Sequence, residues 1–161
     1  MFIRKKFKIF VTSLCVLFSA NAFSADLEDL IESRQAVMKL YAVNIDYLGD
    51  MIRERIPYNK KAAQDAADNL MALAKLHTYI LWPQGSGLDN PQLKGKTAAK
   101  PEIWQNRADF ESKLEDLRKA ADKLDDVAEG GDRKAIAQQV GVTGEACKAC
   151  HDDYKSKDYL Y

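Results

Sequence analysis

Two cysteines and a histidine near the C-terminal end form the most specific chemical pattern of the chain, Cys147-Lys148-Ala149-Cys150-His151. Thiols three positions apart on a helix lie on one face, about one turn apart, so both can add to the vinyl groups of a single haem. The imidazole of His151, four positions after Cys147, projects from the same face and can bind the iron axially. The Cys-x-x-Cys-His spacing therefore predicts one covalently attached haem c.

The cysteine pair is also open to two other uses. A thioredoxin-like redox pair usually follows a strand, and no β-branched run precedes Cys147. A structural zinc site needs two further ligands, and outside the first 24 residues the sequence adds only His77. A haem-free helical binding module, with Cys147 and Cys150 in a disulfide or on a metal, is the alternative from a different class.

The first 24 residues have the pattern of a cleaved secretory signal. Four basic residues precede an apolar run from Ile9 to Phe18, and small residues follow up to Ser24. The run is too short to span a bilayer as a helix, so no membrane span is expected. We expect cleavage within 22–25 and a single periplasmic domain over 25–161, because c-type haem attachment takes place outside the cytoplasm.

The charge of the exported chain is slight. The whole sequence holds 24 basic and 24 acidic residues, and four of the basic ones precede Asp26, which leaves a net charge near −4. This balance favours neither nucleic acid nor an anionic membrane surface as a partner.

Apolar residues recur at steps of three and four in four segments, which predicts helices over residues 26–55, 59–81, 101–128 and 132–154. Asn59 and Asp132 are the expected N-caps of the second and fourth helices, and Gly130-Gly131 ends the third. Residues 83–100 are rich in glycine, proline and asparagine and are expected to be a loop. The pattern predicts an all-α fold, an antiparallel four-helix bundle with the haem near the C-terminal helix.

The order of these features resembles the class II c-type cytochromes, the cytochrome c prime family, in which the attachment motif lies near the C-terminus. The matching segments are Ser33–Lys39, Trp82–Ser86, Pro-Glu-Ile-Trp at 101–104 followed by Phe110, and Val140–Lys155. The resemblance covers the whole exported chain.

The resemblance assigns roles to residues of this sequence. It implies that Cys147 and Cys150 hold the haem through thioethers and that His151 is the proximal ligand. Arg34 and Gln35 match a polar pair that meets a haem propionate, and a buried guanidinium in an otherwise apolar stripe does need a paired anion. The alternative for Arg34 is a side chain that reaches the bundle end or pairs with an acidic neighbour.

Three further positions match the family's pocket. Tyr79 and Trp82 match aromatic positions that flank the haem, although such a pair is also ordinary in a bundle core. Lys155 matches a basic position near the proximal imidazole. His77 also lies on an inner stripe, but the family position is usually apolar, so we expect it not to bind iron.

Met38 separates two functions. In cytochrome c prime its position lies over the distal iron face without a bond, which leaves the iron five-coordinate, whereas in low-spin relatives a methionine of this helix is the sixth ligand. An open apolar site admits nitric oxide or carbon monoxide, while a closed one favours electron transfer. The third reading is that Met38 simply fills the core.

We therefore expect a periplasmic monohaem c-type cytochrome with a site that is open or weakly closed by Met38, rather than an enzyme. Its expected roles are one-electron transfer, small-gas (NO, CO) binding, or both, with redox proteins of the periplasm as partners. The low-spin carrier with Met38 as sixth ligand is the alternative. The resemblance also implies a homodimer through the first two helices.

Overall fold

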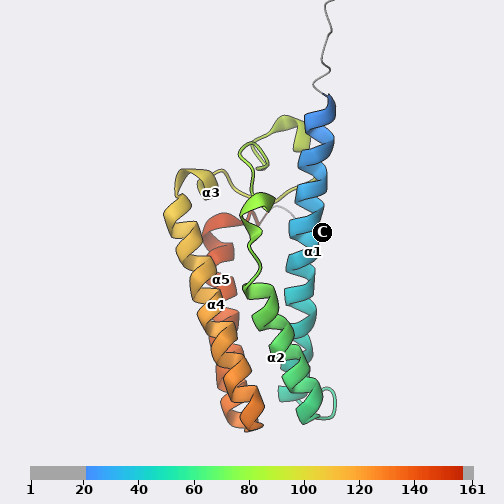
Figure 1. Ribbon diagram of the computed structural model, residues 1–161, viewed down its shortest axis with the longest axis vertical. Helices are drawn as coiled ribbons and strands as arrows, with labels where there is room; N and C mark the ends of the chain where they lie inside the picture. The colour runs from blue at the N-terminus through green and yellow to red at the C-terminus, as the bar shows by residue number, and fades with distance from the viewer. Residues whose placement is uncertain (1–20, 158–161) are drawn as a thin grey trace, which may run out of the picture.

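The computed structural model describes residues 21–157, which fold into an elongated bundle (Figure 1). Its elements in chain order are α1 (Asn21–Ile52), α2 (Lys60–Ala74), the 3₁₀ turns η1 (Thr78–Leu81) and η2 (Pro91–Leu93), α3 (Glu102–Gln105), α4 (Arg107–Gly130) and α5 (Arg133–Tyr154). The four long helices run antiparallel, which confirms the predicted all-α four-helix bundle. The proposed signal falls mostly on residues 1–20, outside the described part of the chain.

Within residues 21–157 no β-strand forms, and one isolated antiparallel bridge joins Ala99 to Lys155. In the same range, no helix has both the length and the apolar character needed to cross a membrane.

The structure has the predicted capping residues at three helix ends: the starts of α2 and α5 and the end of α4. The Asn59 side chain accepts a hydrogen bond from the amide of Ala62, and the Asp132 carboxylate accepts one from the amide of Lys134. Gly131 ends α4 in the left-handed conformation, with φ of 77°, which glycine adopts without strain. These caps fix the turns that make neighbouring helices antiparallel.

The second helix is shorter than predicted. It ends at Ala74 rather than near Leu81, and the chain continues through η1 and an irregular segment to residue 100. The sequence after Ala74 includes β-branched and aromatic residues and then Pro83, which disfavours helical backbone at Trp82. As a result η1 and the following loop, not α2, lie beside α1 in the upper half of the bundle (Figure 1).

Other boundaries also differ from the prediction, and α1 already begins at Asn21 rather than at Asp26. The helix expected from Pro101 to Ala128 breaks at Asn106, whose φ of −118° and ψ of 50° are not helical. The break separates the short α3 from α4 and leaves Ile103 buried. The first helix ends at Ile52 rather than near Arg55, and Glu54 just beyond it has a positive φ of 57°.

The bundle has two apolar cores. The larger one, in the half that contains α2, is built from buried residues of α1, α2, α4 and α5: Leu48, Met51, Ala63, Ala66, Ala67, Leu70, Ala121, Leu124, Ala128 and Ile136. The alanines of α2 allow close packing against α1 and α4. The second core is smaller and consists of Ala99, Ile103, Phe110 and Tyr154, with Cys150 and Trp82 packed against it.

Candidate functional site

A cavity of about 630 Å³ lies between α1 and α5, beside the smaller core, and α2 contributes no residue to its wall. The apolar side chains of the wall are Met38, Trp82, Ile103, Phe110 and Leu114, together with Ala36, Ala42, Ala98 and Ala99. The volume is in the range typical of sites for small molecules and cofactors. The early end of α2 is what makes this space.

The cysteine–histidine motif lies on the last turns of α5. Cys150 and His151 line the cavity. Cys147, one turn earlier, is half-buried and lies close enough to Tyr41 to help raise the pKa of its hydroxyl, which burial raises most. The two thiols are not joined in a disulfide. Burial raises the pKa of Cys147 and raises that of Cys150 to about 11, so both thiols are protonated at neutral pH and are poor partners for disulfide exchange.

The imidazole of His151 is adapted to bind a metal. Loss of hydration lowers its pKa below the usual range, and the positive charge of Lys155 lowers it further. At neutral pH the ring is therefore uncharged, which leaves a nitrogen lone pair for a metal. Lys155 lies at the same end of the cavity and contributes to its wall.

Several hydrogen bonds and an ion pair between Lys113 and Asp153 fix the end of α5 on the rest of the bundle. The Tyr154 hydroxyl donates a 2.6 Å hydrogen bond to Asp109 on α4, and burial together with this bond raises the pKa of Tyr154. The amide of Lys100 donates to the Tyr154 carbonyl at 3.0 Å, and the amide of Ser156 donates to the Ala98 carbonyl at 2.9 Å. These bonds hold the helix turn that carries His151 against the cavity.

Arg34 crosses from α1 to the loop that closes the cavity. It is only 4% exposed, and its Nη2 donates to the Ser86 carbonyl at 2.6 Å and to Thr97 Oγ1 at 2.7 Å. Its Nη1 donates to Ser86 Oγ at 2.8 Å, and the guanidinium lies 4.6 Å from the centre of the Trp82 ring. Gln35 likewise donates to the backbone carbonyl of Lys96 at 2.8 Å.

Ser86 and Thr97 thus hold Arg34 in place, a role that the sequence pattern does not predict. Both are almost fully buried and neither belongs to a helix. A signal was available, because buried hydroxyl groups are expected where a buried arginine must be satisfied, but the loop sequence alone does not show which hydroxyls meet Arg34.

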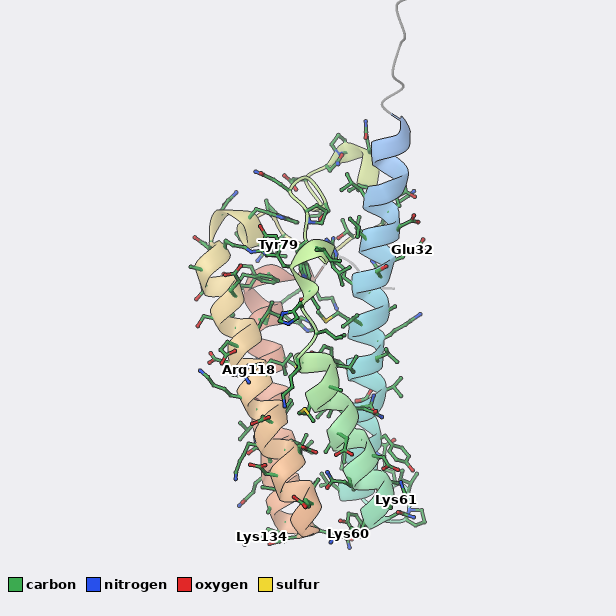
Figure 2. All side chains as sticks on the ribbon, in the orientation of Figure 1. Glu32, Lys60, Lys61, Tyr79, Arg118 and Lys134 are labelled. Carbon is green, nitrogen blue, oxygen red and sulfur yellow. The ribbon has the colours of Figure 1, made fainter. Side chains whose placement is uncertain are left out.

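The predicted aromatic pair separates in the structure. Trp82 lines the cavity and packs edge-to-face on Phe110, with ring centres 5.0 Å apart. Tyr79 is 72% exposed, lies outside the cavity wall, and has the Arg107 guanidinium 4.5 Å from its ring centre. Figure 2 shows Tyr79 on η1, facing the space in front of α4. His77 is exposed and also lies outside the wall.

The chemistry of this wall fits a haem. Most of it is apolar, and it includes Cys150 and the neutral imidazole of His151. Its polar side chains are Glu32, Arg34, Gln35, Lys39, Thr97 and Lys155. An apolar macrocycle with anionic substituents needs this combination of surfaces. Among the described residues, no group of three or more histidine, cysteine, aspartate or glutamate side chains could hold a separate metal ion.

The fold and the site together define a bundle-type c-type cytochrome. The family model described as Cytochrome C' matches residues 29–155, and the chain belongs to this family. Its members carry covalently bound haem c, so the cofactor prediction is confirmed.

The similar proteins align with this chain over nearly their whole length. Cytochrome c-554 of Cereibacter sphaeroides is 36% identical over 132 residues, which are 82% of this chain and 96% of that protein. Cytochrome c' of the same species is 33% identical over 93% of this chain and 98% of its own length. The solved structure of cytochrome c prime from Shewanella frigidimarina superposes with a TM-score of 0.73 at 36% identity, covering 81% of this chain and 97% of that one.

Proposed function

We propose that this monohaem cytochrome binds a small diatomic gas and transfers single electrons in the periplasm, with His151 as proximal ligand and Met38 over the opposite face of the iron. The observation that carries the proposal is the apolar wall of the cavity between His151 on α5 and Met38 on α1. Bound haem supplies an iron that cycles between the ferric and ferrous states and has a position for an exchangeable ligand.

The side chains around the cavity have separable roles. His151 offers a neutral imidazole whose position is fixed by the contacts of Tyr154. Trp82, Phe110 and Leu114 exclude water from the cavity, which favours an uncharged ligand over an ion. Arg34 keeps the loop that carries Trp82 against α1.

A relative supports gas binding as the main role. A variant of cytochrome c prime from Alcaligenes xylosoxidans, in which one leucine is replaced by alanine, was solved as a nitric oxide complex. That chain is 27% identical to this one and superposes with a TM-score of 0.71. The apolar wall of this protein provides similar surroundings for such a ligand.

The second candidate is a low-spin electron carrier with Met38 as sixth ligand. It is favoured by one observation, the thioether-bearing side chain of Met38 in the wall of the same cavity as His151. Closing the sixth position would exclude gases and reduce reorganisation on electron transfer.

One optical measurement distinguishes the two candidates. For the purified ferrous protein we expect a broad high-spin Soret band that sharpens under carbon monoxide, and we expect the same class of spectrum for Met38→Ala. Sharp low-spin α and β bands that disappear in Met38→Ala would replace our proposal by the carrier. Met38→Leu, which keeps the volume but removes the sulfur, is the matched control.

We also propose that two copies associate through α1, and that redox proteins of the periplasm are its other partners. A cytochrome c' at 30% identity and TM-score 0.73 is described by its ligand-controlled dimer dissociation. In this chain α1 carries three exposed apolar side chains at helical spacing, Leu40, Val43 and Tyr47. We propose ligand binding and electron transfer rather than an enzymatic role, and the mostly apolar wall of the cavity supports this.

A further inference from the structure

Three hollows, one of them the haem cavity itself, form a series that leads to the surface of the bundle. The main cavity is followed by a small chamber of about 40 Å³, and then by a surface hollow of about 230 Å³ at η1 and α4. The small space, here named the side chamber, is bounded by α1, the end of α2, η1 and α4. Its volume exceeds the roughly 10–15 Å³ that one water molecule requires.

Shared walls connect the three spaces in a series. Met38, Trp82 and Leu114 line both the main cavity and the side chamber. Ala74 and Thr78, with Trp82 and Leu114 again, line both the side chamber and the surface hollow. In each case a single layer of side chains separates the neighbouring spaces. Figure 2 shows Tyr79 and Arg118, two residues of the surface hollow, on facing elements at this side of the bundle.

The lining of the side chamber is suited to an apolar guest. Aliphatic side chains predominate, contributed by Val37, Leu81, Leu114 and Leu117. The guanidinium of Arg34, which also reaches the wall, already donates hydrogen bonds to the loop. Tyr41 and Thr78 add two hydroxyl groups to the wall. A chamber with a mostly aliphatic and aromatic lining accepts small apolar molecules.

The partitions consist of side chains that can move. Met38 has an unbranched side chain with three rotatable bonds, so it can change rotamer at little cost. Ala74 has the smallest side chain of the four residues that line both the side chamber and the surface hollow, so a larger residue at this position would narrow the outer partition. Passage through the series would need side-chain rotations rather than helix movements.

We propose that the side chamber is a docking site for an apolar diatomic gas on its way between the surface hollow and the haem cavity. This proposal rests on the gas-binding function proposed above and adds the route. It assigns Met38 and Leu114 to the inner partition and Ala74 to the outer one.

Xenon tests the chamber independently of iron chemistry. Crystals of the holoprotein under xenon pressure should show anomalous density in the side chamber, and Ala74→Leu, which fills the space, should lose it. Ala72→Leu on the exposed face of the same helix is the matched control and should keep it. Absence of xenon from the chamber in the folded wild-type protein would overturn the proposal, even if the iron binds gas.

Flash photolysis of the carbon monoxide complex tests the route. We expect Ala74→Leu to slow bimolecular rebinding by about threefold, a modest change in activation free energy. Leu117→Ala, which enlarges the chamber alone, should lower the geminate fraction, and Ala72→Leu should match the wild type. Unchanged kinetics in both chamber variants would refute the route. If the iron binds no carbon monoxide, the gas-binding function fails, and the xenon density then decides whether the chamber takes an apolar guest.

Discussion

The guanidinium of Arg34 is buried between α1 and an irregular loop. Each of its N–H groups therefore needs a hydrogen-bond acceptor. Its guanidinium meets the carbonyls of Leu81 and Ser86 and the hydroxyls of Ser86 and Thr97. The bonds tie a segment without regular secondary structure to the longest helix of the bundle. Arg34 therefore acts on the cavity through the loop as well as by lining it.

Replacing Thr97 by valine should weaken this connection. Thr97 Oγ1 accepts hydrogen bonds from Arg34 Nη2 and from the amide of Ala99 at 3.1 Å, and Thr97 is only 2% exposed. Thr97→Val keeps the shape but leaves buried donors without that acceptor, so we expect a loss of about 1–3 kcal/mol in the free energy of unfolding. Urea unfolding of the holoprotein measures it. Thr97→Ser retains the hydroxyl and should lose clearly less; equal losses in the two variants would contradict the role of the hydroxyl.

At the scale of single residues, the sequence predicts a site residue where the chemistry depends on the spacing of neighbouring residues along the chain. Cys150 and His151 are adjacent, so any helix that contains them brings them to the same end of the bundle. Arg34 is identified because it interrupts an apolar stripe. Its partners Ser86 and Thr97 are not identifiable, because their positions depend on the path of a loop that has no periodic pattern.

Helices α2 and α4 are joined by an unusual polar contact. The Gln64 amide donates to carboxylates of both Asp68 and Asp125, the bond to Asp125 measuring 2.8 Å, and the two carboxyl groups are themselves hydrogen-bonded. Burial first, and then the neighbouring Asp68, raise the pKa of Asp125 to about 6, whereas the pKa of Asp68 is lowered, chiefly by its hydrogen bond with Asp125. One proton is thus shared between the helices in weakly acidic solution.

This pair predicts a pH dependence of stability that an asparagine removes. Because the pKa of Asp125 is raised from 3.8 to about 6 on folding, the native state holds more protons than the unfolded chain between these values, and stability from this group falls as pH rises through them. Asp125→Asn keeps an acceptor for Gln64 and removes the repulsion. We expect the variant to gain up to about 1 kcal/mol over the wild type between pH 4 and 7, since solvent screens the partly exposed pair.

Thermal unfolding of both proteins at several pH values checks this prediction. The charge-matched control is Asp116→Asn on the same helix, whose carboxylate is exposed and lies 3.7 Å from Lys119 Nζ. A difference between Asp125→Asn and wild type that is constant from pH 4 to 7 would rule out the shared proton.

The helices show why the spacing of apolar residues predicts that a helix forms better than it predicts where the helix ends. Four apolar stripes correctly predict four long helices, because each stripe must face a common core. Beside the local sequence after Ala74, tertiary contacts hold the following segment in its non-helical path: the Leu81 carbonyl accepts a bond from Arg34 at 3.3 Å, and the Trp82 carbonyl accepts one from Trp104 Nε1 at 3.1 Å. The spacing of apolar residues does not show which distant side chains meet these carbonyls.

The whole molecule is divided along its length into a filled half and a hollow half. Figure 2 shows Lys60, Lys61 and Lys134 at the end that contains α2, and Glu32 and Tyr79 toward the other end. The alanine-rich core fills the first half, while α1, the loop, α3, α4 and α5 surround the cavity in the second. The same chain thus combines a scaffold held by helix packing with a site held largely by loop hydrogen bonds.

The proposed association of two copies belongs to the scale of the whole molecule, and the exposed apolar side chains of α1 are the surface that we propose for it. Leu40, Val43 and Tyr47 are 51%, 65% and 44% exposed and recur at steps of three and four, so they form one apolar stripe. A contiguous apolar stripe on a long helix is typical of an interface. Sedimentation of the holoprotein over a range of concentrations should therefore show a reversible dimer.

Val43→Arg should dissociate that dimer. A two-fold interface would place the new charge on both copies within an apolar contact, and we expect the dissociation constant to rise at least about tenfold, equal to about 1.4 kcal/mol. Val142→Arg is the matched control, because Val142 is 54% exposed on α5, away from the stripe, and should leave association unchanged. Both variants should keep the wild-type optical spectrum, since neither residue lines the cavity. A wild-type protein that stays monomeric at every concentration, or equal weakening by both substitutions, would show that the α1 stripe is not the contact between copies.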